Sequence, residues 1–153
     1  MVIYMDKILS FIVNKDNQFL LLKTNPNDLQ FKKSFWYVVT GECEIEDKNL
    51  IDTVIREIKE ETGISKLNKV IYLNWILKYT SLNLKCTEYV YISFVNESLI
   101  TLNEENIDYM WCNIDDFIKN IHWFGNKKEL QNVLEMALRN VLYFKEENVQ
   151  ILE

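Results

Sequence analysis

The chain has 153 residues, which is enough for one domain with a hydrophobic core. Hydrophobic residues make up 48% of it and aromatic residues 13%, a composition that excludes a disordered chain. The net charge of −6 argues against broad binding to nucleic acid or to an anionic membrane. It leaves room for a small phosphorylated substrate, because a bound metal ion can invert the local field.

The cysteines and the N-terminus bear on the cellular compartment. Cys43, Cys86 and Cys112 are odd in number and lack a recognisable ligand spacing, which argues against a disulfide scaffold. Residues Met1 to Lys7 do not resemble a signal peptide, and no stretch approaches the roughly 20 apolar residues that span a bilayer. We therefore expect a cytoplasmic protein without a membrane segment.

Short apolar runs separated by polar turns dominate the first quarter of the chain. Lys7 to Asn14 and Gln18 to Thr24 predict a β-hairpin. The polar segment Asn25 to Lys33 predicts a surface loop, and Phe35 to Val39 predicts another strand.

A helix is predicted from Asn49 to Thr62, after an acidic loop from Glu42 to Lys48. Gly63 is a good C-terminal cap for it. Four apolar residues at helical spacing are expected to face a sheet: Ile51, Val54, Ile55 and Ile58.

The second half of the chain predicts more strands and two helices. Strands are expected at Val70–Tyr79, Thr87–Val95 and Tyr109–Cys112, with a turn at Ser81–Lys85, and helices at Ile114–Ile121 and Leu130–Val141. The charged segment Glu146 to Glu153 is expected to fray. This order of elements predicts an α/β (α+β) fold in a single domain over residues 1–153, with a mixed sheet and helices on both faces.

The predicted helix carries an unusual acidic cluster. Glu57, Glu60 and Glu61 stand at i, i+3 and i+4 and share one side of the helix, at the expected rim of a cleft. Like charges at this spacing repel, so the cluster points to a hard divalent cation such as Mg²⁺ among the oxygens. Arg56 lies one turn before Glu60, where it can pair with that carboxylate.

The residues around this cluster resemble the Nudix box, G-x5-E-x7-R-E-U-x-E-E-x-G-U. The second half of the pattern matches the run Arg56-Glu57-Ile58-Lys59-Glu60-Glu61-Thr62-Gly63-Ile64 at every specified position. The first half carries one residue too many between Gly41 and Arg56. Asp47 or Glu46 is then expected in place of the first glutamate of the box.

Segments outside the box resemble the branch of the family that hydrolyses dATP and dihydroneopterin triphosphate. One is the lead-in Phe35-Trp36-Tyr37-Val38-Val39-Thr40-Gly41, and another is Glu105 followed six residues later by Trp111. The stretch from Trp123 to Leu130 resembles the C-terminal part of that branch. The resemblance as a whole implies a Nudix-type α/β/α sandwich.

The resemblance also implies an activity and a site. A diphosphate linkage in a nucleoside triphosphate-like substrate would be hydrolysed with Mg²⁺ or Mn²⁺, releasing pyrophosphate. Metal ligands carried over by position are Gly41 through its carbonyl, Glu57, Glu60, Glu61 and Glu105; the expected catalytic residues are Arg56, Glu60, Glu61 and Glu105. Which glutamate acts as the general base stays open.

Three residues outside the box are candidates for contacts with the substrate. Lys23 and Lys33 could reach a phosphate, and Phe35 could stack on a base.

Alternative functions are hydrolysis of another nucleoside diphosphate derivative (a sugar nucleotide, a dinucleotide polyphosphate or a capped RNA end) and a non-catalytic Nudix-like binding or regulatory domain. The expected partner is a small nucleotide-like diphosphate, with nucleic acid disfavoured, and a homodimer is common in the family.

Overall fold

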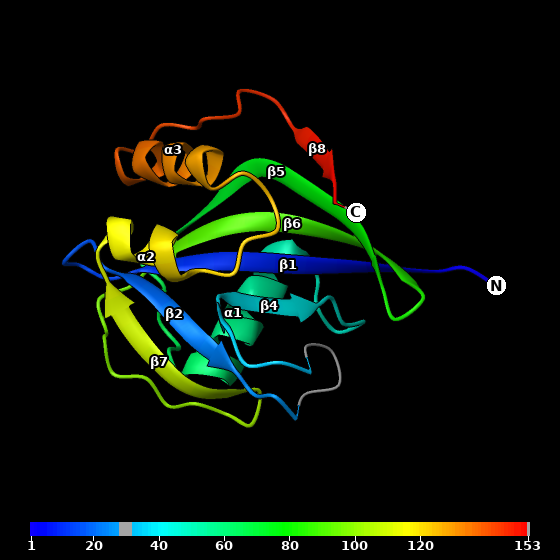
Figure 1. Ribbon diagram of the computed structural model, residues 1–153, viewed down its shortest axis with the longest axis horizontal. Helices are drawn as coiled ribbons and strands as arrows, with labels where there is room; N and C mark the ends of the chain where they lie inside the picture. The colour runs from blue at the N-terminus through cyan, green and yellow to red at the C-terminus, as the bar shows by residue number, and fades with distance from the viewer. Residues whose placement is uncertain (28–31, 153) are drawn as a thin grey trace.

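A mixed eight-stranded sheet forms the centre of the molecule, shown in Figure 1. The computed structural model describes residues 1–27 and 32–152. Its strands are β1 (Ile3–Val13), β2 (Phe19–Thr24), β3 (Trp36–Tyr37), β4 (Val39–Glu42), β5 (Lys69–Ser81), β6 (Leu84–Phe94), β7 (Asn106–Cys112) and β8 (Asn148–Ile151), and its helices are α1 (Leu50–Thr62), α2 (Ile114–Asn120) and α3 (Lys127–Leu138). The strand order is β3-β2-β1-β6-β5-β8, with β4 paired to β1 and β7 paired to β2.

The helices lie on both faces of this sheet, so the expected α/β/α sandwich is confirmed. Figure 1 shows α2 and α3 on one side and α1 on the other. Side chains alternate between the two faces along each strand. On β1, Leu9 and Phe11 belong to the core under α2 and α3, whereas Ile8 and Ile12 belong to the core with α1. No helix in the described residues is long and apolar enough to cross a membrane.

One edge of β1 pairs with two different strands in turn, and a cavity lies where those two strands separate. The predicted hairpin is present, but β2 pairs with β1 only where Val13 meets Phe19. Further along the same edge, residues Lys7 to Ser10 pair with β4 instead. β2 and its partner β7 therefore diverge from β1, as Figure 1 shows. Thr24 of β2 and Gly41 of β4 line a cavity between the separated strands.

The prediction of one strand from Phe35 to Val39 is wrong. The chain passes here from one partner strand to another. Tyr37 pairs with Leu22 of β2, whereas Val39 pairs with Ser10 of β1. Val38, between the two pairings, belongs to neither strand. Of the predicted loop that precedes this crossing, residues 28–31 lie outside the described part.

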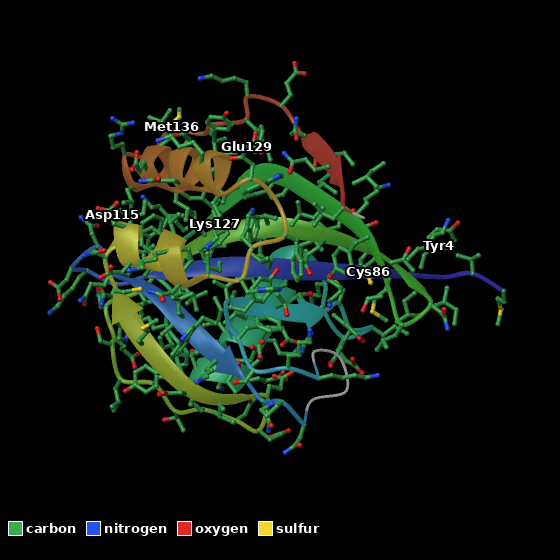
Figure 2. All side chains as sticks on the ribbon, in the orientation of Figure 1. Tyr4, Cys86, Asp115, Lys127, Glu129 and Met136 are labelled. Carbon is green, nitrogen blue, oxygen red and sulfur yellow. The ribbon has the colours of Figure 1, made fainter. Side chains whose placement is uncertain are left out.

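The prediction of a fraying C-terminal segment is wrong as well. Residues Asn148 to Ile151 form β8, which pairs in parallel with β5. Gln150 Nε2 also donates a hydrogen bond of 3.0 Å to Glu129 Oε1 on α3, the helix on which Figure 2 labels Glu129. α3 itself ends at Leu138, earlier than predicted, and Val141 beyond it is exposed.

Candidate active site

Helix α1 carries the acidic cluster and is capped at both ends. The Asn49 side chain accepts a hydrogen bond of 2.9 Å from the backbone N–H of Asp52. At the other end Gly63 has a φ of 79°, and its N–H donates to the Lys59 carbonyl at 2.9 Å. The predicted cap is confirmed, and it fixes which turn of the helix reaches the cavity.

The buried face of α1 is rotated from the face that apolar spacing predicts. Val54 and Ile58 are buried as expected, but Ile51 and Ile55 are exposed. Their places on the buried side are taken by polar residues, among them Glu57 and Glu61. The expectation that the glutamates lie at a rim, neither buried nor outside, is therefore wrong for these two.

The close approach of β4 to α1 explains this rotation. Gly41 has no side chain, and the carboxylate of Glu57 occupies the space where a Cβ would stand. The glycine is needed here for space, because its backbone is in an ordinary strand.

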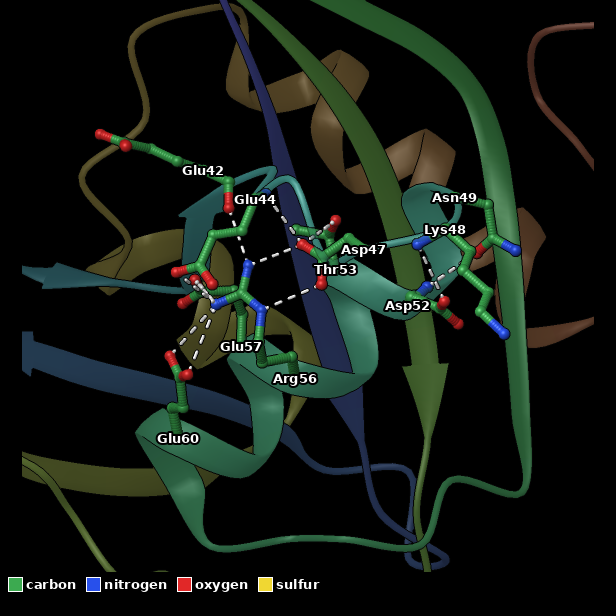
Figure 3. A network of polar contacts seen from close by, with 10 residues as sticks. All are labelled: Glu42, Glu44, Asp47, Lys48, Asn49, Asp52, Thr53, Arg56, Glu57 and Glu60. Carbon is green, nitrogen blue, oxygen red and sulfur yellow. Dashed lines mark hydrogen bonds and ion pairs between the residues drawn. The ribbon is translucent and has the colours of Figure 1, made fainter.

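Arg56 is the centre of an ion-pair network, shown in Figure 3. Its Nη1 donates to Glu57 Oε1 at 2.8 Å, and its Nη2 donates to the Glu42 carbonyl at 2.8 Å. The expected pair with Glu60 is present at 3.4 Å. These contacts hold the Glu57 carboxylate toward the cavity.

Asp47 is the strongest partner of Arg56. Its carboxylate accepts from both Nε and Nη2, at 3.2 and 2.9 Å, and from the Thr53 hydroxyl at 2.8 Å. These hydrogen bonds hold the pKa of Asp47 well below its ordinary value. Glu46, the other candidate for the displaced acid of the box, is exposed. Asp47 is thus the acid that positions the arginine.

Three carboxylates converge beside this network. Oxygens of Glu57, Glu61 and Glu105 lie within 4.8 Å of one another. Glu57 and Glu61 come from α1, while Glu105 comes from the loop before β7, where Asn103 Nδ2 donates to it at 3.1 Å. Burial raises the pKa of Glu57 to about 7, partly offset by Arg56. Burial, together with the negative charges of Glu105 and Glu57, raises the pKa of Glu61 as well.

This cluster fits a divalent cation. Glu61 Oε1 accepts a hydrogen bond of 3.4 Å from Asn106, but its buried Oε2 has no hydrogen-bond partner in the described part of the chain. A buried carboxylate oxygen without a donor is costly unless a cation neutralises it. Carboxylate oxygens are the ligands that Mg²⁺ and Mn²⁺ prefer.

The cluster borders a cavity of about 720 Å³. Gly41 and Glu60 also line this cavity, although Glu60 is not among the three clustered carboxylates and its side chain is half exposed. Lys23, Lys33 and Phe35 are not among its lining residues. Lys23 lies over the Trp36 ring, Lys33 is exposed, and Phe35 packs against Tyr37 and His122. Their binding role stays a prediction.

Lys7 is a cavity residue that the sequence interpretation missed. It lines the same cavity, is only 3% exposed, and forms no ion pair within the described residues. Its Nζ lies 5.9 Å from the centre of the Tyr79 ring. The signal was its position in β1, since Lys7 shares the alternation of the buried Leu9 and Phe11.

Comparisons with known proteins agree with this fold. The model of the NUDIX domain matches residues 4–133. Among solved structures, the MutT protein of Methanosarcina mazei Go1 is 21% identical with a TM-score of 0.67, covering 91% of this chain and 96% of its own. The E. coli dihydroneopterin triphosphate pyrophosphohydrolase is 20% identical with a TM-score of 0.66, covering 87% and 98%. A C. elegans Ap4A hydrolase is 19% identical with a TM-score of 0.64, covering 91% and 97%.

The search of curated proteins gave no match. The family model nevertheless spans most of the chain, and Gly41, Glu57, Glu60 and Glu61 line one cavity. The chain therefore belongs to the NUDIX domain family and is a Nudix hydrolase with the fold of the pyrophosphohydrolases.

Proposed function

We propose that this protein hydrolyses the diphosphate linkage of a nucleoside triphosphate-like substrate, dATP or dihydroneopterin triphosphate, and releases pyrophosphate. The observation that carries the proposal is the convergence of Glu57, Glu61 and Glu105 around an oxygen without a donor. These three residues would hold Mg²⁺ or Mn²⁺. When bound, the ion would neutralise phosphate charge and lower the pKa of a water molecule.

The protein's own side chains supply the rest of the chemistry. Arg56 fixes the rotamer of Glu57, and Asn103 and Asn106 orient Glu105 and Glu61. A carboxylate of the cluster takes the proton of the attacking water as the new P–O bond forms and the bond to the leaving pyrophosphate breaks. Lys7 lines the same cavity, and its positive charge would offset the charge of the phosphate chain.

A product assay tests the proposal. Purified protein with Mg²⁺ is given dATP, dihydroneopterin triphosphate, a sugar nucleotide, a dinucleotide polyphosphate and a capped RNA, while pyrophosphate and orthophosphate are measured separately. Pyrophosphate from either of the first two substrates supports the proposal. Hydrolysis of the other substrates alone would replace it with the broader Nudix activity, and binding without any product would replace it with a regulatory role.

A further inference from the structure

A second cavity lies beside the one that Glu57, Glu61 and Glu105 border, on the face of the sheet that α2 and α3 cover. Its volume is about 280 Å³, and Thr40 of β4 lines both cavities. Aromatic rings dominate its walls, contributed by Tyr37, Tyr79, Trp123 and Phe124. A substrate whose phosphates lie by the glutamates can therefore extend past Thr40 into an apolar space.

One charged side chain lies inside this second cavity. Glu88 of β6 lines it although the residue is only 2% exposed. Its Oε2 accepts a hydrogen bond of 2.7 Å from the Tyr79 hydroxyl, and within the described residues no other hydrogen bond to Glu88 is found. Burial and the charge of Glu88 raise the pKa of Tyr79, so the hydroxyl stays protonated and acts as the donor.

The hydrogen-bonding capacity of Glu88 is consequently only partly used. A carboxylate offers about four lone-pair sites, and the Tyr79 hydroxyl takes one of them. Lys7, which is the β1 partner of Glu88 in the parallel pairing, supplies a nearby positive charge without an ion pair. The cavity thus presents acceptors to whatever enters it.

The entrance of the cavity has an aromatic wall. Phe124 is 61% exposed, and its ring centroid lies 6.1 Å from that of Tyr37, at 70°. His122 also packs edge-on against Phe124, with ring centroids 4.9 Å apart. An exposed aromatic ring that is held by neighbouring rings, beside an apolar cavity, can stack on a planar heterocycle.

We propose that this cavity binds the heterocyclic base of the substrate, and that Glu88 accepts two hydrogen bonds from an adjacent ring N–H and exocyclic amino group. That donor pair is present in guanine and in pterin and is absent from adenine, which places a ring acceptor beside its amino group. The inference rests on the proposed function only in taking the ligand to be a nucleotide-like triphosphate. It selects, within that function, the 2-amino-4-oxo heterocycles over dATP.

Binding measured without turnover tests this. With Mg²⁺ present, calorimetry compares the α,β-methylene analogues of dGTP and dITP, which differ only in the 2-amino group. A site built to accept that N–H rejects a ligand without it, so we expect the dITP analogue to bind about ten- to hundredfold more weakly. The α,β-methylene analogue of dATP should bind weakly as well. The α,β-methylene analogue of neopterin triphosphate forms a further arm, and the tighter of it and the dGTP analogue identifies the source of the base.

Variants separate recognition from structure. Glu88→Gln should bring the dGTP and dITP analogues to nearly equal affinity, whereas Glu97→Gln, on the exposed loop after β6, should keep the preference. Equal binding of the two analogues to the unmodified protein, or a full preference retained in Glu88→Gln, would overturn the inference. The ratio in the unmodified protein decides the matter if Glu88→Gln does not fold. Because no hydrolysis is involved, absence of turnover would count against the proposed function alone.

Discussion

The backbone of Gly41 lies directly against the side chain of Glu57, so that a Cβ on the glycine would stand 2.0 Å from Glu57 Cδ. Gly41→Ala must therefore displace the carboxylate from the cluster. We expect turnover with Mg²⁺ to fall about ten- to hundredfold, the size of effect seen when groups that orient a metal ligand are lost.

Gly63→Ala is the matched control for that change. Its positive φ of 79° strains any other residue, so this variant should lose about 1 kcal/mol of unfolding free energy while its dependence on Mg²⁺ is unchanged. Thermal unfolding and a Mg²⁺ titration of the rate distinguish the two. Normal kinetics in Gly41→Ala would show that the position of Glu57 does not matter.

Asp47 positions Arg56, and Arg56 in turn holds Glu57. Asp47→Asn removes the charge that anchors the guanidinium, so we expect kcat to fall about tenfold or more. Glu46→Gln, at the exposed neighbouring position, should behave as the unmodified protein. The reverse result would identify Glu46 as the displaced acid of the box.

Lys7 is buried without an ion pair in the described residues, so removing its charge should affect catalysis more than stability. Lys7→Met keeps the aliphatic stem and removes the charge. We expect kcat/KM to fall about ten- to hundredfold, because a hydrogen bond to a charged group contributes roughly 1.5–3 kcal/mol. The melting temperature should change little, because the cost of burying the Lys7 charge is offset by its attraction to the buried Glu88. Lys48→Met, at an exposed site, should change neither, and a melting temperature that falls in Lys7→Met together with normal kcat/KM would make Lys7 structural.

The raised pKa values in the cluster predict how stability depends on pH. Above the unfolded value of about 4.5 and below the folded value of about 7, Glu57 binds more protons in the folded than in the unfolded chain. The free energy of unfolding must therefore fall as pH rises through this window, and Glu61 acts in the same direction. Without metal, the melting temperature should be higher at about pH 5 than at about pH 8.

Mg²⁺ should change that dependence. The ion replaces the protons among the carboxylates, so its stabilising effect should grow with pH. Melting curves with EDTA and with Mg²⁺ at both pH values check this. An equal shift by Mg²⁺ at the two pH values would mean that the ion binds elsewhere.

Local features of the chain were predictable because neighbouring residues determine them. Asn49 and Gly63 cap α1 through bonds to residues a few positions away. The i, i+3, i+4 spacing likewise brings Glu57, Glu60 and Glu61 to one side of the helix without tertiary information.

The burial of the site residues was not predictable, because it depends on contacts between segments that are far apart in the sequence. Glu57 is buried because Gly41, sixteen positions earlier, lets β4 approach the helix. The inward orientation of Glu88 on β6 likewise depends on a distant segment, because the parallel pairing with β1 places it beside Lys7. The docking of β8 depends on an unpaired edge of β5 that its own short sequence does not reveal.

The proposed hydrolysis requires a divalent cation held by Glu57, Glu61 and Glu105. Calorimetric titration of Mn²⁺ into the metal-free protein, Glu61→Gln and the exposed α3 variant Glu135→Gln tests this directly. Mn²⁺ binding should be saturable in the unmodified protein and in Glu135→Gln. In Glu61→Gln it should be weaker by about a hundredfold or more, with turnover lowered in parallel. Binding in Glu61→Gln equal to that of the unmodified protein would contradict it.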